Sequence, residues 1–226
     1  MTKGLVDGVR RENPNFRPKV IFDVGANVGQ SARVFLESFP EARIQCFEPV
    51  SATFEALSRS LASESRVSVN LLALDQHEHE ARFLAVKRSA GNRLLRRDER
   101  FPETEMVKAM RGDRFCEENA IREVDILKID AEGSDLRVLV GFARSLQEKM
   151  ISYIQVECTT NPDNHFHVQL TSFINYLNPF GYRLFGLFEF TRQIYRTKQK
   201  LNGIWFCNAV FVREVDDPRL RPERIN

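Results

Sequence analysis

The chain has 226 residues, which is enough for one domain with a single hydrophobic core. Its 33 Lys and Arg residues nearly balance its 31 Asp and Glu residues, and the net charge of +2 argues against a nucleic acid or another polyanion as partner. No apolar run approaches the length that spans a membrane, and the four cysteines are widely spaced without a C-x-x-C pair. We therefore expect no membrane span, buried free thiols and a cytoplasmic location, and the pattern allows a homo-oligomer.

Along the chain, apolar residues alternate between strand and helix periods, which predicts an α/β fold with a mostly parallel sheet. Seven strands are expected, the last two as a closing antiparallel pair, over 20–22, 43–47, 67–72, 124–130, 151–157, 181–190 and 204–212. A further short strand is expected over 81–86. Helices are expected over 28–39, 51–61 with Ser51 as the cap, 136–143 and 167–177.

Three segments fall outside this alternation. Residues 1–19 are interpreted as an N-terminal lead-in, 87–116 as a variable loop or lid, and 213–226 as an exposed tail. The stretch 87–114 is rich in arginine, which favours a solvated irregular loop over a lid that binds an anionic acceptor. Nucleic-acid binding is the least favoured interpretation of this stretch because few aromatic residues are interleaved with its charges. We expect residues 1–226 to form a single domain.

The first expected strand leads into the sequence Asp23-Val-Gly-Ala-Asn-Val-Gly29, which predicts a tight turn before a helix. Glu48 ends the next strand, 19 positions beyond Gly29, and Pro49 closes that strand. A turn that cradles a ligand, beside a carboxylate that accepts the ribose hydroxyls, is typical of a nucleoside pocket at the carboxyl edge of a parallel sheet. A Glu48 side chain turned into bulk water would contradict this interpretation.

Asn27 indicates which kind of nucleoside fits the turn. It stands where a dinucleotide-binding turn has the glycine that lets the backbone approach a pyrophosphate. The side chain of Asn27 therefore disfavours a pyrophosphate and a nicotinamide-dependent oxidoreductase. It favours an adenosine that carries a bulky cationic 5′ substituent, as S-adenosylmethionine does.

A second motif strengthens this interpretation. Residues 125–133, Asp-Ile-Leu-Lys-Ile-Asp-Ala-Glu-Gly, resemble the "LKIDVEG" signature of the FkbM family of S-adenosylmethionine-dependent methyltransferases, with Ala131 where valine is common. The segments 139–141 and 154–157 are similar to later parts of the same family. The resemblance implies a single class I (Rossmann-like) methyltransferase domain, with a seven-stranded mostly parallel sheet, helices on both faces and a C-terminal antiparallel strand pair. It also implies O-methylation of a small-molecule or glycan acceptor with a free hydroxyl, such as a sugar, a glycan or a secondary metabolite.

Expected cofactor contacts follow from the turn and from the resemblance. Asp23 is expected to help hold the amino-acid end of the cofactor, the turn amides to receive its carboxylate, and Glu48 to hold its ribose. Leu74 and Asp75 stand where class I methyltransferases commonly contact the adenine. The complete expected set is Asp23, Gly25, Ala26, Asn27, Gly29, Glu48, Pro49, Leu74, Asp75 and Asp130.

The acceptor side is expected at the ends of the fourth and fifth strands, where Asp130 and Glu157 could converge. A hydroxyl is a poor nucleophile at neutral pH, so it needs a base or a metal ion. Either a carboxylate or a histidine, with His165 as the candidate beside His167, acts directly, or Asp130 and Glu157 hold a Mg²⁺ ion. The metal-free account is preferred because no dedicated ligand cluster is present. Strand alternation also predicts that Lys128 and Asp130 share one face and form an ion pair.

Two alternatives to O-methylation stay open. A neutral amine acceptor would need no base, so N-methylation of a small molecule is the nearest alternative. A nucleic-acid methyltransferase is disfavoured by the near-neutral charge.

Overall fold

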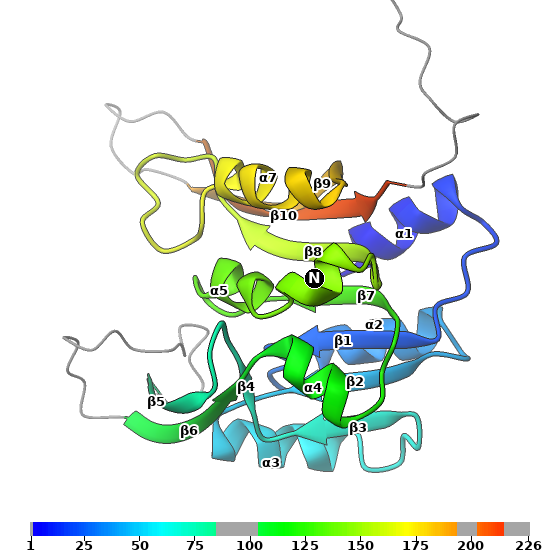
Figure 1. Cartoon of the computed structure of the whole chain (residues 1–226), viewed down its shortest axis with the longest axis vertical. Coiled ribbons are helices and arrows are strands. Elements are labelled where there is room, and N and C mark those ends of the chain that lie inside the picture. Colours follow the sequence, from blue (N-terminus) through cyan, green and yellow to red (C-terminus); the bar gives the residue numbers. More distant parts are fainter. Residues whose placement is uncertain (1, 85–103, 194–202, 215–226) are drawn as a thin grey trace, which may run out of the picture.

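The computed structural model describes residues 2–84, 104–193 and 203–214. A seven-stranded sheet in the order β3-β2-β1-β7-β8-β10-β9 runs through the molecule (Figure 1). Its strands are β1 (Val20–Val24), β2 (Arg43–Phe47), β3 (Val67–Asn70), β7 (Val124–Ile129), β8 (Ile151–Cys158), β9 (Tyr182–Gln193) and β10 (Gly203–Arg213). The first five strands in this order, β3, β2, β1, β7 and β8, pair in parallel with their neighbours. β10 pairs antiparallel with both β8 and β9. The predicted seven-stranded sheet and its closing antiparallel pair are therefore confirmed.

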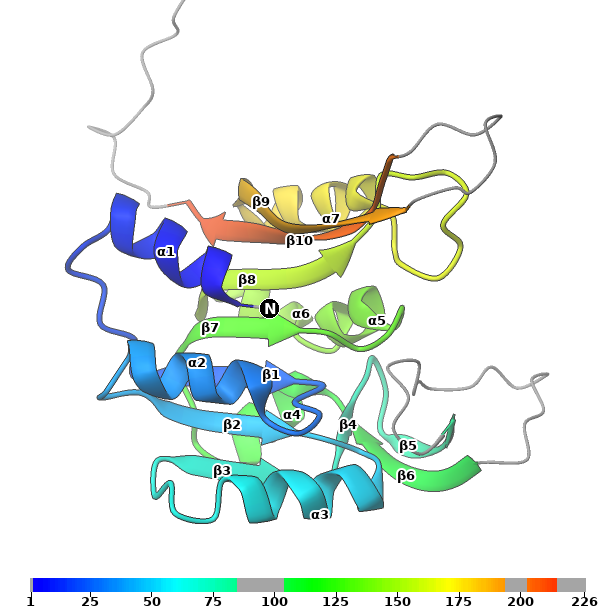
Figure 2. The same cartoon turned by 180° about the vertical axis from the view of Figure 1, so that it is seen from behind.

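Helices cover both faces of the sheet, as expected. One face carries α1 (Lys3–Glu12), α2 (Gln30–Ser38) and α3 (Ser51–Ser60), which stand in front of the sheet in Figure 2. The other face carries α4 (Gly112–Glu118), α5 (Asp135–Val140), α6 (Ala143–Gln147) and α7 (Leu170–Leu177), which stand in front of it in Figure 1. A short 3₁₀ helix, η1 (Asn178–Phe180), follows α7.

Successive side chains of the central strands point to opposite faces of the sheet, so they pack in two separate hydrophobic cores. In β1, Ile21 packs with α1 to α3, whereas Phe22 packs on the other side. The ring of Phe22 lies 5.3 Å from that of Phe47 and 5.7 Å from that of Phe115. Burial on both faces explains why the central strands are near-continuous apolar runs.

A second, three-stranded sheet in the order β4-β6-β5 lies beside the main one. It is made of β4 (Ala73–Leu74), β5 (His79–Leu84) and β6 (Thr104–Met110), so the further strand expected over 81–86 belongs to this small sheet and starts at 79. Residues 104–116 of the expected loop or lid instead form β6 and the start of α4. Val107 and Ala109 are buried while Met106 and Lys108 are exposed, which is a strand alternation too short to stand out among the charges. Residues 87–103 of that loop lie outside the described part of the chain.

The structure corrects several other boundaries. The expected lead-in 1–19 contains α1, whose Leu5, Val6 and Val9 are buried. The N-cap of α3 is Val50, not Ser51, and the Ser51 hydroxyl donates to Glu105 instead.

The helix expected over 136–143 is divided into α5 and α6. The carboxylate of Asp113 accepts the backbone N–H groups of Arg144 and Ser145, which starts the second helix. The helix expected from His167 begins only at Leu170. Of the expected tail, Arg213 ends β10, and 215–226 lie outside the described residues.

All four cysteines are buried free thiols, as predicted. None of the helices in the described ranges combines the length and the apolar character that crossing a bilayer requires.

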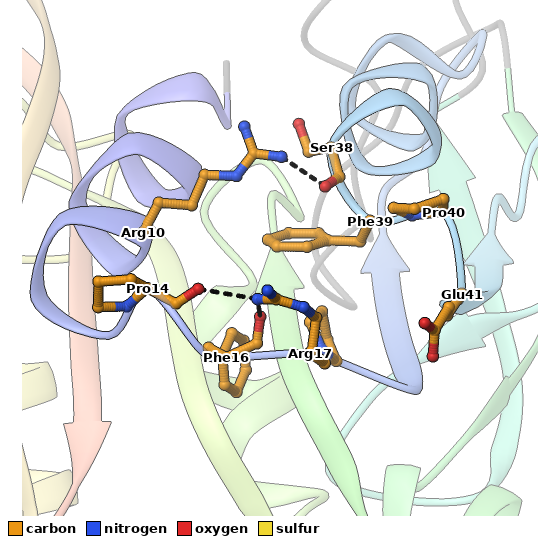
Figure 3. A pocket seen from close by; sticks show the side chains of 9 residues that line it. Arg10, Pro14, Phe16, Arg17, Ser38, Phe39, Pro40 and Glu41 are labelled. Carbon is orange, nitrogen blue, oxygen red and sulfur yellow. Dashed lines mark hydrogen bonds between the residues drawn. The ribbon is translucent and has the colours of Figure 1, made fainter.

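A hollow of about 420 Å³ lies at the amino ends of β1 and β2, at the edge opposite the expected site (Figure 3). The guanidinium of Arg10 donates to the Ser38 carbonyl and lies 5.6 Å from the centre of the Phe39 ring. Arg17 donates to the carbonyls of Pro14 and Phe16. Arg10 therefore fastens α1 to the end of α2, whereas Arg17 bonds within the segment that follows α1.

Candidate active site

The carboxyl ends of four parallel strands meet at one edge of the main sheet. Val24 of β1 pairs with Phe47 of β2 and with Ile129 of β7, and Ile129 pairs with Val156 of β8. The segments that follow these four strands therefore leave the sheet side by side. This register brings candidate residues from separate parts of the sequence to one place.

The turn after β1 has a backbone that few side chains tolerate. Gly25, Asn27 and Gly29 have φ values of 72°, 50° and 93°. A Cβ atom on Gly25 would lie 1.9 Å from the Asp130 carbonyl oxygen, so only glycine fits between this turn and the end of β7. Asn27 adopts the left-handed conformation that its sequence position suggested.

The amide groups of this turn are used within the chain. Gly25 and Ala26 donate to the Phe47 carbonyl, Gly29 donates to the Ala26 carbonyl, and Asn27 donates to Glu48. The N–H donors of these four residues are thus already engaged, so they are not free to receive a cofactor carboxylate. Recognition of that carboxylate by the turn stays a prediction and would need another donor.

Glu48 points at the turn and is 7% exposed. Its Oε2 accepts the Asn27 N–H at 3.1 Å, and its Oε1 accepts the Val50 N–H at 3.0 Å. Each carboxylate oxygen has a second lone pair, so ribose hydroxyls can still donate to it. Burial raises the pKa of Glu48 to about 7, although the two backbone donors act in the opposite direction. The outward-turned Glu48 that would contradict a nucleoside pocket is not what the structure contains.

A buried lysine joins the first strand to the fourth. Lys128 Nζ lies 2.9 Å from Asp23 Oδ1 and 3.5 Å from Asp130 Oδ2, so the predicted pair with Asp130 is present and shared with Asp23. Burial opposes the charge of Lys128, but attraction to both carboxylates outweighs it and raises the pKa of the amine. Asp23 is fully buried, and its Oδ2 has no hydrogen-bond partner among the described residues, so its contact with the amino-acid end of a cofactor stays a prediction.

Four carboxyl groups gather after β7 and β8. Burial, followed by the charges of Asp130, Glu157 and Asp135, raises the pKa of Glu132 to about 8. Burial and the charges of Asp130 and Glu157 raise the pKa of Asp135 to about 7. Glu132 thus retains its proton at neutral pH, and Asp135 titrates near neutral pH. Asp135 had no predicted role, although it follows Asp130 and Glu132 closely in the sequence.

The loop after β8 brings His167, rather than His165, to Glu157. His167 Nε2 lies 2.9 Å from Glu157 Oε2, and its ring stacks on Phe206 with a centroid distance of 4.4 Å. His165 is exposed on the same loop. Glycine again allows a close approach, since a Cβ on Gly133 would lie 2.4 Å from the Phe166 carbonyl oxygen. Phe206 was absent from the prediction because the sequence does not reveal that β10 lies beside β8.

Asp75 is held by an ion pair that no sequence pattern indicated. Arg137 donates to both of its carboxylate oxygens, at 2.9 Å to Oδ1 and 2.5 Å to Oδ2. Asp75 and Leu74 are both buried, as is Pro49. An adenine contact by Leu74 and Asp75 stays a prediction, and for Asp75 it would have to coexist with the Arg137 pair.

The described residues contain no group of three or more His, Cys, Asp or Glu side chains placed to hold a metal ion. The alternative in which Asp130 and Glu157 hold Mg²⁺ therefore gains no support from the described geometry.

Comparison of the sequence with known proteins identifies the family to which the chain belongs. A sequence model of the methyltransferase FkbM domain matches residues 23–184. The chain is 24% identical over 151 residues to the 2-O-methyltransferase NoeI of Sinorhizobium fredii, which covers 60% of this chain and 62% of that protein. It is also 24% identical over 144 residues to the hexuronic acid methyltransferase AglP of Haloferax volcanii, which covers 63% of this chain and 58% of that protein. The chain thus spans less than two thirds of the length of these relatives.

Solved structures agree on the fold. The precorrin-6y C5,15-methyltransferase of Geobacter metallireducens superposes with a TM-score of 0.52 at 10% identity, covering 94% of this chain and 87% of that one. The methyltransferase SMU.1697c of Streptococcus mutans, solved in complex with SAH, also gives 0.52 at 7% identity, covering 94% and 97%. The fold is that of class I methyltransferases, and the chain belongs to the FkbM methyltransferase family.

Proposed function

We propose, on the premise that this chain is an FkbM-family methyltransferase, that it transfers a methyl group from S-adenosylmethionine to a hydroxyl of a sugar, a glycan or a secondary metabolite. The observation that carries the proposal is the buried Glu48 carboxylate beside the Gly25–Gly29 turn. It combines a tight turn with an acceptor for two ribose hydroxyls at the carboxyl edge of the sheet. The alternative of a nicotinamide-dependent oxidoreductase is set aside by the family.

The cofactor would lie across the ends of β1 and β2. Glu48 would accept the ribose hydroxyls, Asp23 would face the amino-acid end, and the Gly25, Ala26, Asn27 and Gly29 turn would give the wall its shape. Leu74 and Asp75, with Pro49, would border the adenine. The bound cofactor supplies an electrophilic methyl group on a sulfonium.

The acceptor would enter over the ends of β7 and β8. Transfer from a sulfonium is an in-line displacement, so positioning and exclusion of water can supply much of the rate. Asp130 and Glu157 are the candidates for the base that takes the hydroxyl proton. Lys128 already pairs with Asp130 at 3.5 Å, whereas no lysine or arginine pairs with Glu157 among the described residues. We therefore assign the base to Glu157 and a positioning role to Asp130.

The relatives support an oxygen acceptor, since one is named a 2-O-methyltransferase and another a hexuronic acid methyltransferase. An amine acceptor is the second candidate, because an amine that arrives neutral has a free lone pair and needs no base to take its proton. The two candidates differ in whether the reaction requires a base.

Calorimetry with S-adenosylhomocysteine tests the cofactor half. We expect micromolar binding by the wild type and a loss of binding in Glu48→Ala. Glu41→Ala is the matched control, because Glu41 lies at the opposite edge and pairs with Lys19 on the surface. Absence of binding in the wild type would contradict the proposal.

Transfer of a labelled methyl group tests the acceptor half. Methyl glycosides of a neutral hexose and of a hexuronic acid are offered beside the matching amino sugars. Mass spectrometry of each labelled product then shows whether the new methyl group is on oxygen or on nitrogen. We expect it on oxygen, and product methylated only on nitrogen would replace the first candidate by the second.

A further inference from the structure

We propose that His167, as the neutral tautomer protonated on Nε2, is the positioning residue that aims the Glu157 carboxylate at the acceptor. The inference rests on the proposed function, in which Glu157 takes the acceptor proton. It begins with a neighbour, Asn164, whose amide orientation is fixed by its surroundings.

Asn164 is 2% exposed, and its Oδ1 accepts the backbone N–H groups of Phe166 and His167, both at 3.0 Å. Two N–H donors can face only the oxygen of the side-chain amide, so the amide cannot be turned over. Its Nδ2 therefore occupies the other position, where it donates to the Trp205 carbonyl at 2.8 Å. The same Nδ2 lies 2.9 Å from Nδ1 of His167.

The fixed amide selects the tautomer of His167. Because Asn164 Nδ2 is a donor, Nδ1 of the ring must accept and carries no proton. Asn164 Oδ1 is farther from Nδ1, at 3.3 Å, and already accepts two N–H groups. The proton of the neutral ring is then on Nε2, which donates to Glu157 Oε2 at 2.9 Å.

This arrangement differs from a catalytic dyad in which histidine is the base. Both ring nitrogens are engaged, the side chain is 7% exposed, and Phe206 covers one face of the ring. His167 is therefore not placed to receive a proton from an acceptor. It ties Glu157 to the carbonyl of Trp205 through Asn164, and so links the end of β8 to β10.

The tie matters because of the other acidic groups at this edge. A charge on Glu132 or on Asp135 interacts unfavourably with a charged Glu157 and would push it outward. Only Oε2 of Glu157 is bonded within the described residues, which leaves Oε1 for the acceptor hydroxyl. A single donor at Nε2 thus sets where the reactive oxygen lies.

Nuclear magnetic resonance reads the tautomer without an acceptor. In protein labelled with ¹⁵N-histidine, with S-adenosylhomocysteine bound, long-range ¹H–¹⁵N correlations show which ring nitrogen carries the proton. Loss of one signal set in His167→Gln assigns it. We expect His167 to be protonated on Nε2 alone at pH 8. A proton on Nδ1, as the neutral tautomer or as an imidazolium, would overturn the proposal.

Kinetics then separate positioning from folding. His167→Phe keeps a ring on Phe206 but removes the donor, and we expect its kcat for the methyl glycosides to fall roughly 10- to 100-fold. His167→Gln keeps an N–H donor and should recover part of that loss. Both variants should bind S-adenosylhomocysteine with a dissociation constant within about twofold of that of the wild type. A twofold change is small beside the loss of a hydrogen bond to a charged group.

His165→Gln is the matched control, since His165 is exposed on the same loop and should leave kcat unchanged. An unchanged kcat in a folded His167→Phe variant would overturn the positioning role. Failure of the wild type to bind S-adenosylhomocysteine would instead refute the proposed function, and the ring assignment would still be read from the spectra.

Discussion

The turn after β1 and the edge after β7 and β8 adjoin each other but are held by different kinds of contact. In the turn, main-chain N–H groups act as donors: the Phe47 carbonyl accepts those of Gly25 and Ala26, and the Glu48 carboxylate accepts that of Asn27. After β7 and β8, side chains hold side chains, as in the bond from His167 to Glu157. The first region has a shape set by backbone geometry, whereas the second is a group of charges whose protonation varies with pH. This difference matches the proposed division, in which the turn borders the cofactor and the carboxylate edge takes the acceptor proton.

The largest effect is expected from a substitution that changes the carboxylate edge and leaves the turn intact. Glu157→Gln removes the assigned base, and we expect kcat for a hydroxyl acceptor to fall about 10²- to 10⁴-fold. Affinity for S-adenosylhomocysteine should stay the same, because the turn is untouched. Glu148→Gln, at an exposed position, is the control. A variant that keeps most of its rate would indicate a neutral amine acceptor instead.

The second largest effect is expected from a substitution in the turn. Gly25→Ala places a Cβ against the Asp130 carbonyl at a φ of 72°, and we expect a loss of roughly 2–4 kcal/mol in the free energy of unfolding. Urea denaturation measures the change, and cofactor binding should fail with it. Gly203→Ala is the matched control, because no atom lies within 4 Å of a Cβ at that position. Equal stability of the two variants would show that the close approach to Asp130 is not rigid.

A pH titration sharpens the role of Glu48. Its pKa of about 7 means that the carboxylate needed by the ribose hydroxyls is formed above that pH and lost below it. Affinity for S-adenosylhomocysteine should therefore be greatest above pH 7 and fall by up to about tenfold for each pH unit below it. Glu48→Gln should bind more weakly and show a flatter profile, since its amide must point a donor at the N–H of Asn27 or Val50. A wild-type profile that is flat between pH 6 and 8 would count against the ribose contact.

The smallest expected effect concerns Glu132. Its folded-state pKa of about 8 lies above the ordinary value, so its contribution to stability is present at low pH and is lost as pH rises to about 8. Thermal unfolding should show the wild type losing stability between about pH 5 and 8. Glu132→Gln, which is neutral throughout, should lose less over the same range. Parallel curves for the two proteins would mean that burial and the neighbouring carboxylates do not raise the pKa of Glu132.

The same division explains what the sequence could predict. A backbone that needs left-handed residues and a close approach demands particular amino acids, so the sequence predicted the turn at Gly25 and Gly29. The spacing also placed Glu48 beside this turn, and its cofactor contact stays a prediction. The strand ends at Asp130 and Glu157 also followed from periodicity. The acceptor side was less accessible, because the choice of His167 over His165 depends on how Asn164 bends the loop. The ion pair between Asp75 and Arg137 joins segments far apart in sequence and left no local pattern.

Elements that were missed share a physical reason. β6 and α4 lie in a stretch where charges interrupt short apolar alternations. Their burial comes from residues elsewhere in the chain, Phe22 for α4 and Val50 and Ala73 for β6. The apolar positions of α1 are few, and that helix gains its stability from the sheet beneath it.

The buried ammonium of Lys128 constrains the register in which β1 and β7 can pair. In the native pairing, Asp23 stands opposite Lys128 on neighbouring strands. A slip of one residue between β1 and β7 would turn the side chains of one strand to the other face and leave a lone cation in an apolar layer. The shifted pairing would have a much higher free energy than the native one, because the buried charge would lack its partner. Lys128 therefore favours one register of the two strands.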